Sequence, residues 1–311
     1  MKENKVVMAG AGVMGASLAQ VYALAGYDTY VYDIYEAGLE KGKHLISINQ
    51  EMMVKEGLIT AEESKAALAR MTFTLDKECF RDCCLVVEST VERMDIKQNF
   101  FAEISEIAPA EALLATNTSG LKITEIAKAC KHPERFMGQH WLNPPHLLPL
   151  CEIIAGEQTS QENVQKMRKL VEGLGKQPVV VADINGFIIN RIQFAVLREA
   201  LHIVDIGAAS IEDVDTVLKA GMGLRYAALG PFGVADFGGL DTFDHINSYL
   251  NAELDDSKVG NKRLHEMVEA GKLGVKSGQG FYDYSGDKAD EAIRERDRLY
   301  IELAKVLYFK K

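Results

Sequence analysis

The sequence has 311 residues, of which 47% are hydrophobic and 26% are charged, and its formal net charge is −10. Single hydrophobic cores stop growing at about 250–300 residues, so two domains are predicted, and the composition excludes a disordered or fibrous protein. The acidic balance disfavours general binding to nucleic acid or to anionic membrane surfaces. The sequence contains neither a signal-like apolar stretch after its first residues nor a run of roughly 20 apolar residues, so we expect a soluble, cytoplasmic protein.

The first elements along the chain alternate between predicted strands and a predicted helix, with a glycine-rich turn between them. A short apolar run at 6–8 predicts a strand, and the glycine-rich segment 10–15 follows it at once. Residues 17–25 have the spacing of a helix, and residues 29–32 predict a second strand that ends at Asp33. A G-x-G-x-x-G pattern alone is weak, but here it lies between strand and helix with an acid 18 positions later.

Each part of this unit has a physical role toward a dinucleotide. The first glycine permits a tight turn, the second lets a pyrophosphate approach the backbone, and the third allows close packing of helix on strand. Asp33 can accept hydrogen bonds from ribose hydroxyls and would repel a 2′-phosphate, which favours NAD over NADP. The alternative is a glycine turn in a domain that holds no nucleotide. The predicted cofactor-binding residues are Gly10, Gly12, Val13, Met14, Gly15 and Asp33.

The next segments continue an α/β domain. Residues 38–75 predict a helical hairpin that ends in a short strand, with a capping-box pattern at Thr60–Glu63. An apolar run at 84–88 and another at 113–117 predict central strands, and residues 97–107 between them predict an amphipathic helix. Polar side chains that follow such strands lie where doubly wound folds bind their ligands.

A candidate acid–base pair follows a further predicted helix at 123–129. His140 stands in an extended segment, Asn143–Pro145 reverses the chain, and Glu152 stands in the next extended segment. This strand–turn–strand arrangement brings His140 and Glu152 together. A carboxylate that orients an imidazole is the usual form of a general base. The alternative for a lone histidine is core packing or a surface turn.

The remainder of the chain predicts a second, helical domain. An apolar strand at 178–181 precedes the segment 183–186, which marks the boundary. We predict an α/β protein of two domains. Residues 1–183 form a Rossmann-type doubly wound domain that includes the helical hairpin, and residues 184–311 form an all-α domain. The predicted helices of the second domain are 187–204, 211–219, 242–254, 264–270 and 289–307. The five cysteines (Cys79, Cys83, Cys84, Cys130 and Cys151) form no CxxC pair, so neither a disulfide framework nor a metal site is expected.

A set of motifs in a fixed order extends over essentially the whole chain. They are the segments 10–15 with Asp33, 87–92, 117–119, His140 with Asn143–Pro144, Glu152, 183–191, 230–232 and 278–282. Together these motifs resemble the 3-hydroxyacyl-CoA dehydrogenase family. No short motif is decisive, but their order and spacing across two domains are specific.

The resemblance implies an NAD-dependent oxidation of a secondary alcohol at C3, as in fatty acid metabolism, by a homodimer joined through its helical domains. Carried over by motif, His140 takes the hydroxyl proton while a hydride passes to the nicotinamide, and Glu152 orients that histidine. Ser119 and Asn190 hydrogen-bond the substrate oxygen in this reading. The further positions placed near the cofactor are Glu92, Lys97 and Asn117.

The sequence departs from the acyl-CoA members of the family in the hairpin at 38–75, which those members make basic to meet the CoA phosphates. Here the hairpin holds five positive and five negative side chains, so a highly charged carrier is poorly attracted. Gly120 also stands where a second serine is common, and Pro149 where a lysine is common.

The segment 221–231 is similar to that of relatives acting on small free hydroxy acids, the L-gulonate and L-carnitine dehydrogenase branch that includes lambda-crystallin. Within it, Arg225 can hold a substrate carboxylate in bidentate fashion; the alternative is an ion pair between helices. We therefore favour a small free 3-hydroxy acid as substrate, with a 3-hydroxyacyl-CoA such as 3-hydroxybutyryl-CoA as the alternative. A non-catalytic, crystallin-like NAD-binding protein would not need His140 and Glu152 together.

Overall fold

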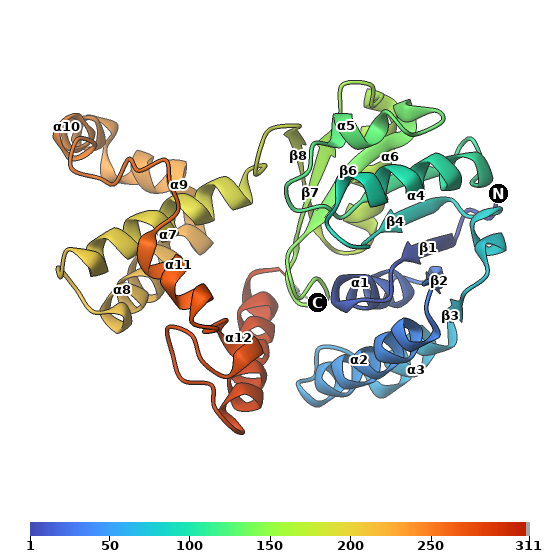
Figure 1. The fold of residues 1–311 in the computed structure, drawn as a ribbon, viewed down its shortest axis with the longest axis horizontal. Coiled ribbons are helices and arrows are strands. Elements are labelled where there is room, and N and C mark those ends of the chain that lie inside the picture. Colours follow the sequence, from blue (N-terminus) through green and yellow to red (C-terminus); the bar gives the residue numbers. More distant parts are fainter. Residues whose placement is uncertain (309–311) are drawn as a thin grey trace. The chain divides into compact units, whose positions relative to one another are not determined.

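The computed structural model describes residues 1–308 of the chain, and these form two compact units. Among the described residues, one unit comprises 1–188 and 297–308, and the other comprises Ile189–Arg296 (Figure 1). The first unit is built on a sheet, and the second consists of helices joined by loops.

The sheet of the first unit has eight strands in the order β3-β2-β1-β4-β5-β6-β7-β8 within the described residues. Neighbouring strands are parallel except β6 and β7, which are antiparallel. The strand order reverses between β1 and β4, as in a doubly wound dinucleotide-binding sheet, so the predicted fold class is confirmed. The strands are β1 (Lys5–Ala9), β2 (Asp28–Tyr32), β3 (Met71–Thr74), β4 (Leu85–Glu88), β5 (Leu113–Thr116), β6 (Phe136–Trp141), β7 (Leu150–Ala155) and β8 (Gln177–Ala182).

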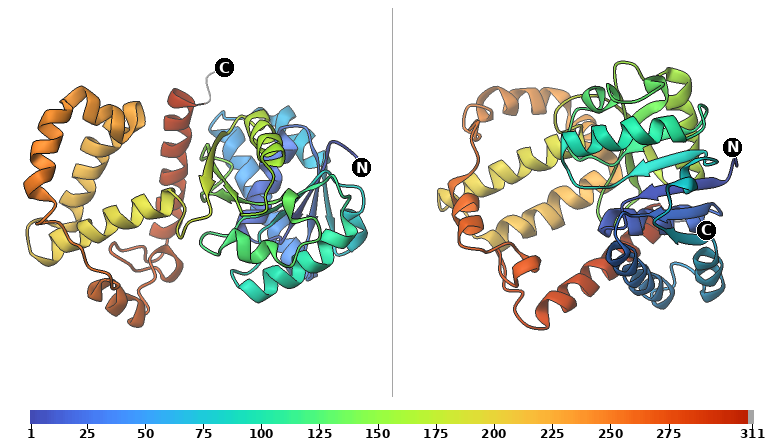
Figure 2. Two further views of the ribbon diagram at one scale, coloured as in Figure 1. Left: turned by 90° about the horizontal axis from the view of Figure 1, so that it is seen from above. Right: turned by 45° about the vertical axis from the view of Figure 1, so that its right-hand side comes forward.

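Helices cover both faces of this sheet, which explains why its central strands β1, β4 and β5 are buried at every position and mostly apolar. Val6 and Met8 face one core together with α1, α2 and α6, and Val7 and Ala9 face the other core together with α4 and α5. The views in Figure 2 show the helices of this unit on either side of its sheet. The helices are α1 (Val13–Leu24), α2 (Glu36–Lys55), α3 (Ala61–Ala69), α4 (Met94–Ile107), α5 (Ile123–Ala127) and α6 (Gln161–Gly173).

The predicted hairpin is the pair α2 and α3, followed by β3 alongside β2. Its predicted capping box is confirmed. Thr60 Oγ1 accepts a hydrogen bond from Glu63 N at 3.1 Å, and Glu63 Oε2 accepts one from Thr60 N at 2.7 Å. The two bonds satisfy donors that would otherwise be unpaired at the start of α3.

The second unit contains one helical stretch that the sequence did not predict. After α8, the π-helical turn η3 (Leu218–Gly223) leads directly into α9. Gly230, with φ of 70°, kinks α9 just before Pro231. Glycine and proline are poor helix formers, and here they conceal the helical period. The helices are α7 (Ile189–Asp205), α8 (Ile211–Val217), α9 (Leu224–Gly238), α10 (Leu240–Leu250), α11 (Lys262–Glu269) and α12 (Lys288–Leu307), of which α12 crosses into the first unit.

The two compact units divide the chain after Ile188 and again within α12. Asp183, shortly before the first division, accepts hydrogen bonds from Thr124 N at 2.9 Å and Ile123 N at 3.2 Å at the start of α5. The second half of α12 belongs to the first unit. Ile301 of α12 is buried in one apolar cluster with Met53 and other first-unit residues. Helical periodicity shows that a segment is amphipathic but not which core it joins.

Residues 1–308 contain no helix with the length and apolarity that a membrane crossing requires, and no cluster of potential metal ligands. All five cysteines are free. Burial raises the pKa of Cys79, Cys83 and Cys130 to about 12, so these thiols stay protonated at neutral pH.

Candidate active site

The predicted site residues of the first unit gather at one edge of its sheet. The carboxyl ends of the parallel strands β1, β2, β4, β5 and β6 meet at this edge. Gly10, Asp33 and Asn117 each follow the last residue of one of these strands, and His140 is the fifth of the six residues of β6. This is the edge at which doubly wound sheets bind their ligands.

The three glycines of the loop after β1 are required for different reasons. Gly10 has φ of 100°, and a Cβ there would lie 2.7 Å from Ser89 O. A Cβ on Gly15 would lie 1.8 Å from Gly10 O, so no other residue fits without a backbone shift. A Cβ on Gly12 would meet no atom within 4 Å. Gly10 and Gly15 are therefore required by contacts within the protein itself. Gly12 instead borders open space at the N-terminus of α1, where a pyrophosphate fits.

Asp33 braces this loop from the end of β2. Its Oδ2 accepts a hydrogen bond from Ala11 N at 2.8 Å, and its Oδ1 accepts one from Tyr35 N at 3.0 Å. A Cβ on Gly38 would lie 2.9 Å from this carboxylate, so the neighbouring helix approaches it closely. Each carboxylate oxygen can accept a further bond, which leaves Asp33 able to bind ribose hydroxyls. The glycine loop and Asp33 thus fit a bound NAD.

His140 and Glu152 are direct partners across the antiparallel strands β6 and β7. His140 Nδ1 lies 2.8 Å from Glu152 Oε2, and the two residues are 4% and 2% exposed. Glu152 Oε1 accepts a second hydrogen bond from Ile188 N at 3.0 Å. With Nδ1 engaged by the carboxylate, Nε2 is the ring nitrogen that can take up a proton. The sequence-based pairing of these two residues is what the structure shows.

The loop that carries Ser119 is held by Glu92. Glu92 Oε1 accepts hydrogen bonds from Ser119 N at 2.8 Å and from Thr118 Oγ1 at 2.5 Å, and the Ser119 side chain is exposed. Asn117 Oδ1 accepts a hydrogen bond from Trp141 N at 3.0 Å. Trp141 follows His140 directly in β6, so this hydrogen bond joins the end of β5 to the end of the strand that carries His140.

Lys97 is a buried support of the same loop. Its side chain is 1% exposed, and its ammonium lies 2.7 Å from Glu88 Oε1 and 3.4 Å from Glu92 Oε2. Glu88 Oε2 also accepts a hydrogen bond from Thr116 Oγ1 at 2.6 Å. The sequence placed Lys97 near the cofactor, and the structure places its charge within this network. Glu88 was missed as part of the site, although a charged residue at the end of an apolar strand was a visible signal.

A second buried lysine holds the connection between β6 and β7. Lys176 donates hydrogen bonds to Pro145 O at 2.8 Å, to Leu148 O at 3.1 Å and to His146 O at 3.4 Å. Burial lowers the pKa of Lys176 to about 7. The Lys176 side chain therefore holds, through these hydrogen bonds, the turn that sets the register of His140 and Glu152.

Two predicted site residues belong to the second unit. Asn190 is the second residue of α7, and its Oδ1 accepts a hydrogen bond from Gln193 Nε2 at 2.8 Å. Arg225 lies in the first turn of α9 and is exposed. The structure thus brings Glu92, Asn117, Ser119, His140 and Glu152 together in the first unit and places Asn190 and Arg225 on the second.

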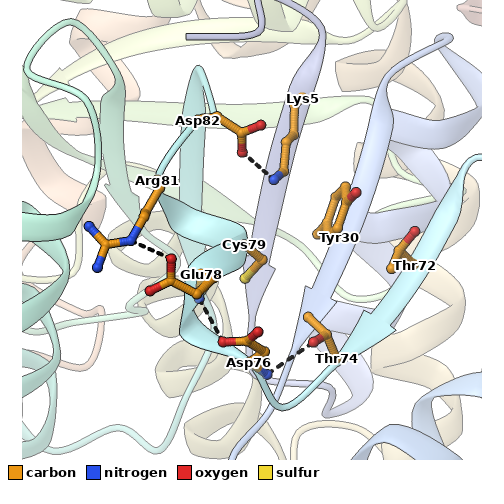
Figure 3. A pocket seen from close by; sticks show the side chains of 9 residues that line it. All are labelled: Lys5, Tyr30, Thr72, Thr74, Asp76, Glu78, Cys79, Arg81 and Asp82. Atoms are coloured by element: carbon orange, nitrogen blue, oxygen red, sulfur yellow. Dashed lines mark hydrogen bonds and ion pairs between the residues drawn. The ribbon is translucent and has the colours of Figure 1, made fainter.

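A hollow of about 470 Å³ in the first unit lies away from these residues (Figure 3). Its lining includes Lys5, the first residue of β1, and Asp82, which precedes β4. These two side chains form an ion pair, and the Lys5 ammonium also lies 4.1 Å from the centre of the Tyr30 ring. Because these residues are at the amino ends of their strands, the hollow is not part of the candidate active site.

Comparisons with known proteins agree with this geometry. The profile for the 3-hydroxyacyl-CoA dehydrogenase NAD-binding domain matches residues 5–184. The profile for the 3-hydroxyacyl-CoA dehydrogenase C-terminal domain matches residues 186–284.

The chain is also similar to individual relatives of two kinds. A probable 3-hydroxybutyryl-CoA dehydrogenase of Deinococcus radiodurans is 41% identical over 276 residues, which cover 88% of this chain and 98% of the relative. The 5-formyl-3-hydroxy-2-methylpyridine 4-carboxylate 5-dehydrogenase of Mesorhizobium japonicum is 32% identical over 306 residues, which cover 98% of each chain. The crystal structure of a dehydrogenase for the same pyridine carboxylic acid, described as an NAD⁺-dependent dismutase, has a TM-score of 0.91 at 32% identity and covers 99% of this chain and 100% of its own. The chain therefore belongs to the 3-hydroxyacyl-CoA dehydrogenase family and is an NAD-dependent dehydrogenase.

Proposed function

We propose that this dehydrogenase oxidises the C3 secondary alcohol of a small free 3-hydroxy acid to a ketone. The observation that carries the reaction type is the buried pair of His140 and Glu152, 2.8 Å apart at the ligand-binding edge of the sheet. His140 Nε2 takes the hydroxyl proton, and Glu152 holds the ring and stabilises the imidazolium that forms. Bound NAD supplies the acceptor for the hydride. Ser119 and Asn190 donate hydrogen bonds to the substrate oxygen.

The proposed cofactor residues are those that border the glycine loop and the neighbouring strand ends. Asp33 accepts from the ribose, and the backbone N–H groups at the start of α1 bind the pyrophosphate. Glu92 and Lys97 act through the loop that they hold, and Asn117 acts through its bond to Trp141. The set comprises Gly10, Gly12, Val13, Met14, Gly15, Asp33, Glu92, Lys97 and Asn117.

The charge of the α2–α3 hairpin supports a small acid over a CoA ester. Residues 38–75 carry no net charge, and within α2 Lys43 is engaged by Glu40 at 2.6 Å. A CoA carrier brings several negative phosphate charges, and a neutral surface gives them little electrostatic attraction. A free acid needs no such surface.

Arg225 supplies the second argument for a free carboxylate. A guanidinium binds a carboxylate through two parallel hydrogen bonds, and a thioester offers no such partner. The relative that covers 98% of this chain is named for a pyridine carboxylate substrate, which is a free acid. An ion pair between helices is the other use that Arg225 can have.

A 3-hydroxyacyl-CoA, such as 3-hydroxybutyryl-CoA, is the second candidate substrate. It is favoured by the 41% identical relative, a probable 3-hydroxybutyryl-CoA dehydrogenase. We also propose that the enzyme forms a homodimer through its helical unit. That unit exposes large apolar side chains such as Phe232 (86%) and Phe237 (83%), and exposed apolar surface of this kind favours association.

One assay separates these possibilities. The enzyme is incubated with NAD and either free 3-hydroxy acids or 3-hydroxyacyl-CoA esters, and NADH formation is followed by absorbance. We expect a higher kcat/KM on a free acid than on any CoA ester. A higher kcat/KM on a CoA ester would contradict the proposed substrate class. No NADH formation on any substrate, while NAD still binds, would contradict the proposed activity and favour a non-catalytic NAD-binding protein.

The role of Arg225 is tested with the same assay. Arg225→Met is expected to raise KM for the free acid by about 10- to 100-fold, because a charge-assisted pair is lost. Lys262→Met is the matched control, since Lys262 is an exposed cation of the same unit, with 89% side-chain exposure. An unchanged KM in Arg225→Met removes Arg225 from the substrate site.

A further inference from the structure

Phe187 has a backbone conformation that a bulky side chain rarely adopts. Its φ is 49°, in the left-handed region, and Gly186 before it has φ of 77°. His132 is the one other described non-glycine residue with positive φ. Phe187 differs from His132 in being 1% exposed within the core of the first unit. Such a conformation persists only where the surroundings enforce it, and it is concentrated at functional sites.

The ring of Phe187 packs against the imidazole of His140. The two ring centroids are 5.4 Å apart, with an interplanar angle of 55°. Glu152 approaches the imidazole at Nδ1. The imidazole is thus held by an ionic partner at one nitrogen and by an apolar ring packed against it.

The backbone of Phe187 also determines where Glu152 is held. The peptide between Phe187 and Ile188 carries the Ile188 N–H, so φ and ψ of Phe187 orient that group. This N–H donates to Glu152 Oε1 at 3.0 Å, while Oε2 of the same carboxylate binds His140. The turn is fixed on its other side by the hydrogen bond from Phe187 N to Ile184 O at 3.1 Å.

We infer that Phe187 is a positioning residue for His140, acting through its ring and through the Ile188 N–H that holds Glu152. This inference rests on the proposed role of His140 as the base. A misplaced base slows the chemical step and leaves the binding of substrate and cofactor intact. The strained φ of Phe187 allows its ring to pack on His140 while the Ile188 N–H next to it binds Glu152.

The first test is Phe187→Leu, which removes the ring but keeps an apolar side chain. The substrate is the one that the wild type oxidises fastest. We expect kcat to fall by about 10- to 100-fold, with KM and the Kd for NAD changed by less than about threefold. The primary deuterium isotope effect on kcat, measured with substrate deuterated at the carbinol carbon, is expected to rise because hydride transfer becomes rate-limiting. Phe187→Tyr keeps the ring and is expected to recover most of the wild-type kcat.

Phe101→Leu is the matched control, because Phe101 is 0% exposed in the same core. It is expected to lower the Tm to a similar degree while leaving kcat and the isotope effect as in the wild type. Wild-type kcat and isotope effect in a folded Phe187→Leu enzyme would overturn the inference, as would an equal loss of kcat in Phe101→Leu. The inference can also fail without any activity assay, if the His140 imidazole proton resonances are the same in Phe187→Leu and wild type. Absence of turnover by the wild type would instead overturn the proposed function.

Discussion

The carboxylate of Glu152 and the imidazole of His140 face each other across β6 and β7, with Oε2 2.8 Å from Nδ1. Both side chains are almost fully buried, so water does not screen the interaction between them. A one-residue slip in strand register would turn one of these side chains to the opposite face of the sheet. The turn between the strands, and Lys176 that holds it, therefore matter to the site as much as the pair itself.

Glu152→Gln should leave the fold intact and lower kcat by about 10²- to 10⁴-fold. The amide has no charge to stabilise the imidazolium and can donate to Nδ1, which would favour the wrong tautomer of His140. Steady-state kinetics measure this effect. Glu157→Gln, an exposed glutamate shortly after β7, is the control and should retain wild-type kcat. Near-normal turnover in Glu152→Gln would show that the carboxylate does not assist the base.

His140→Gln is expected to lower kcat by about 10²- to 10⁴-fold, because the residue that accepts the hydroxyl proton is lost. The Kd for NAD, measured by titration calorimetry, should stay within about twofold of the wild type. His44→Gln replaces an exposed histidine on α2 and serves as control. If His140→Gln retains activity, another group is the base.

Asp33→Asn is expected to raise the Kd for NAD by about 10- to 100-fold, since hydrogen bonds to a charged acceptor contribute about 1.5–3 kcal/mol. The variant also weakens the acceptor for Ala11 N that braces the glycine loop. Discrimination against NADP should fall because the repulsion of a 2′-phosphate is removed. Asp28→Asn, at the exposed amino end of the same strand, should bind NAD normally. An unchanged Kd in Asp33→Asn would remove Asp33 from the cofactor site.

Lys97→Met should destabilise the protein by about 3–5 kcal/mol, because it leaves the Glu88 carboxylate buried without its cation. Chemical denaturation measures the change. Lys77→Met breaks the half-exposed pair of Lys77 with Glu103, so its expected cost is at most about 1 kcal/mol. Adding Glu88→Gln to Lys97→Met should recover part of the loss. Equal effects of the two single variants would contradict the buried role of Lys97.

Lys176 predicts a pH dependence of stability. Burial lowers its folded-state pKa to about 7, below the ordinary value, so above that pH the unfolded chain binds a proton that the folded chain has released. The free energy of unfolding therefore gains about 2 kcal/mol from this residue between about pH 7 and pH 9. Lys176→Met should lose this rise, whereas Lys169→Met, an exposed lysine of α6, should keep it. Parallel pH profiles for Lys176→Met and the wild type would contradict the prediction.

Features that depend on neighbours along the chain could be predicted from the sequence. The glycine loop with Asp33, the capping box at Thr60, and the pairing of His140 with Glu152 each involve segments close in sequence, and turn, cap and strand patterns are local. The order of motifs across the chain then identified the family, its cofactor and its fold class.

Features that join distant segments could not be predicted from the sequence, because they depend on long-range packing. Three such features depend on which surfaces pack together. They are the packing of the Phe187 ring on His140, the burial of Lys97 beside Glu88, and the packing of the end of α12 in the first unit. Helical or strand periodicity predicts that a side chain faces an apolar core, but it does not predict which residues that side chain contacts. The backbone conformation of Phe187 had no sequence signal, because a left-handed φ at a bulky residue is imposed by packing around it rather than by its own preference.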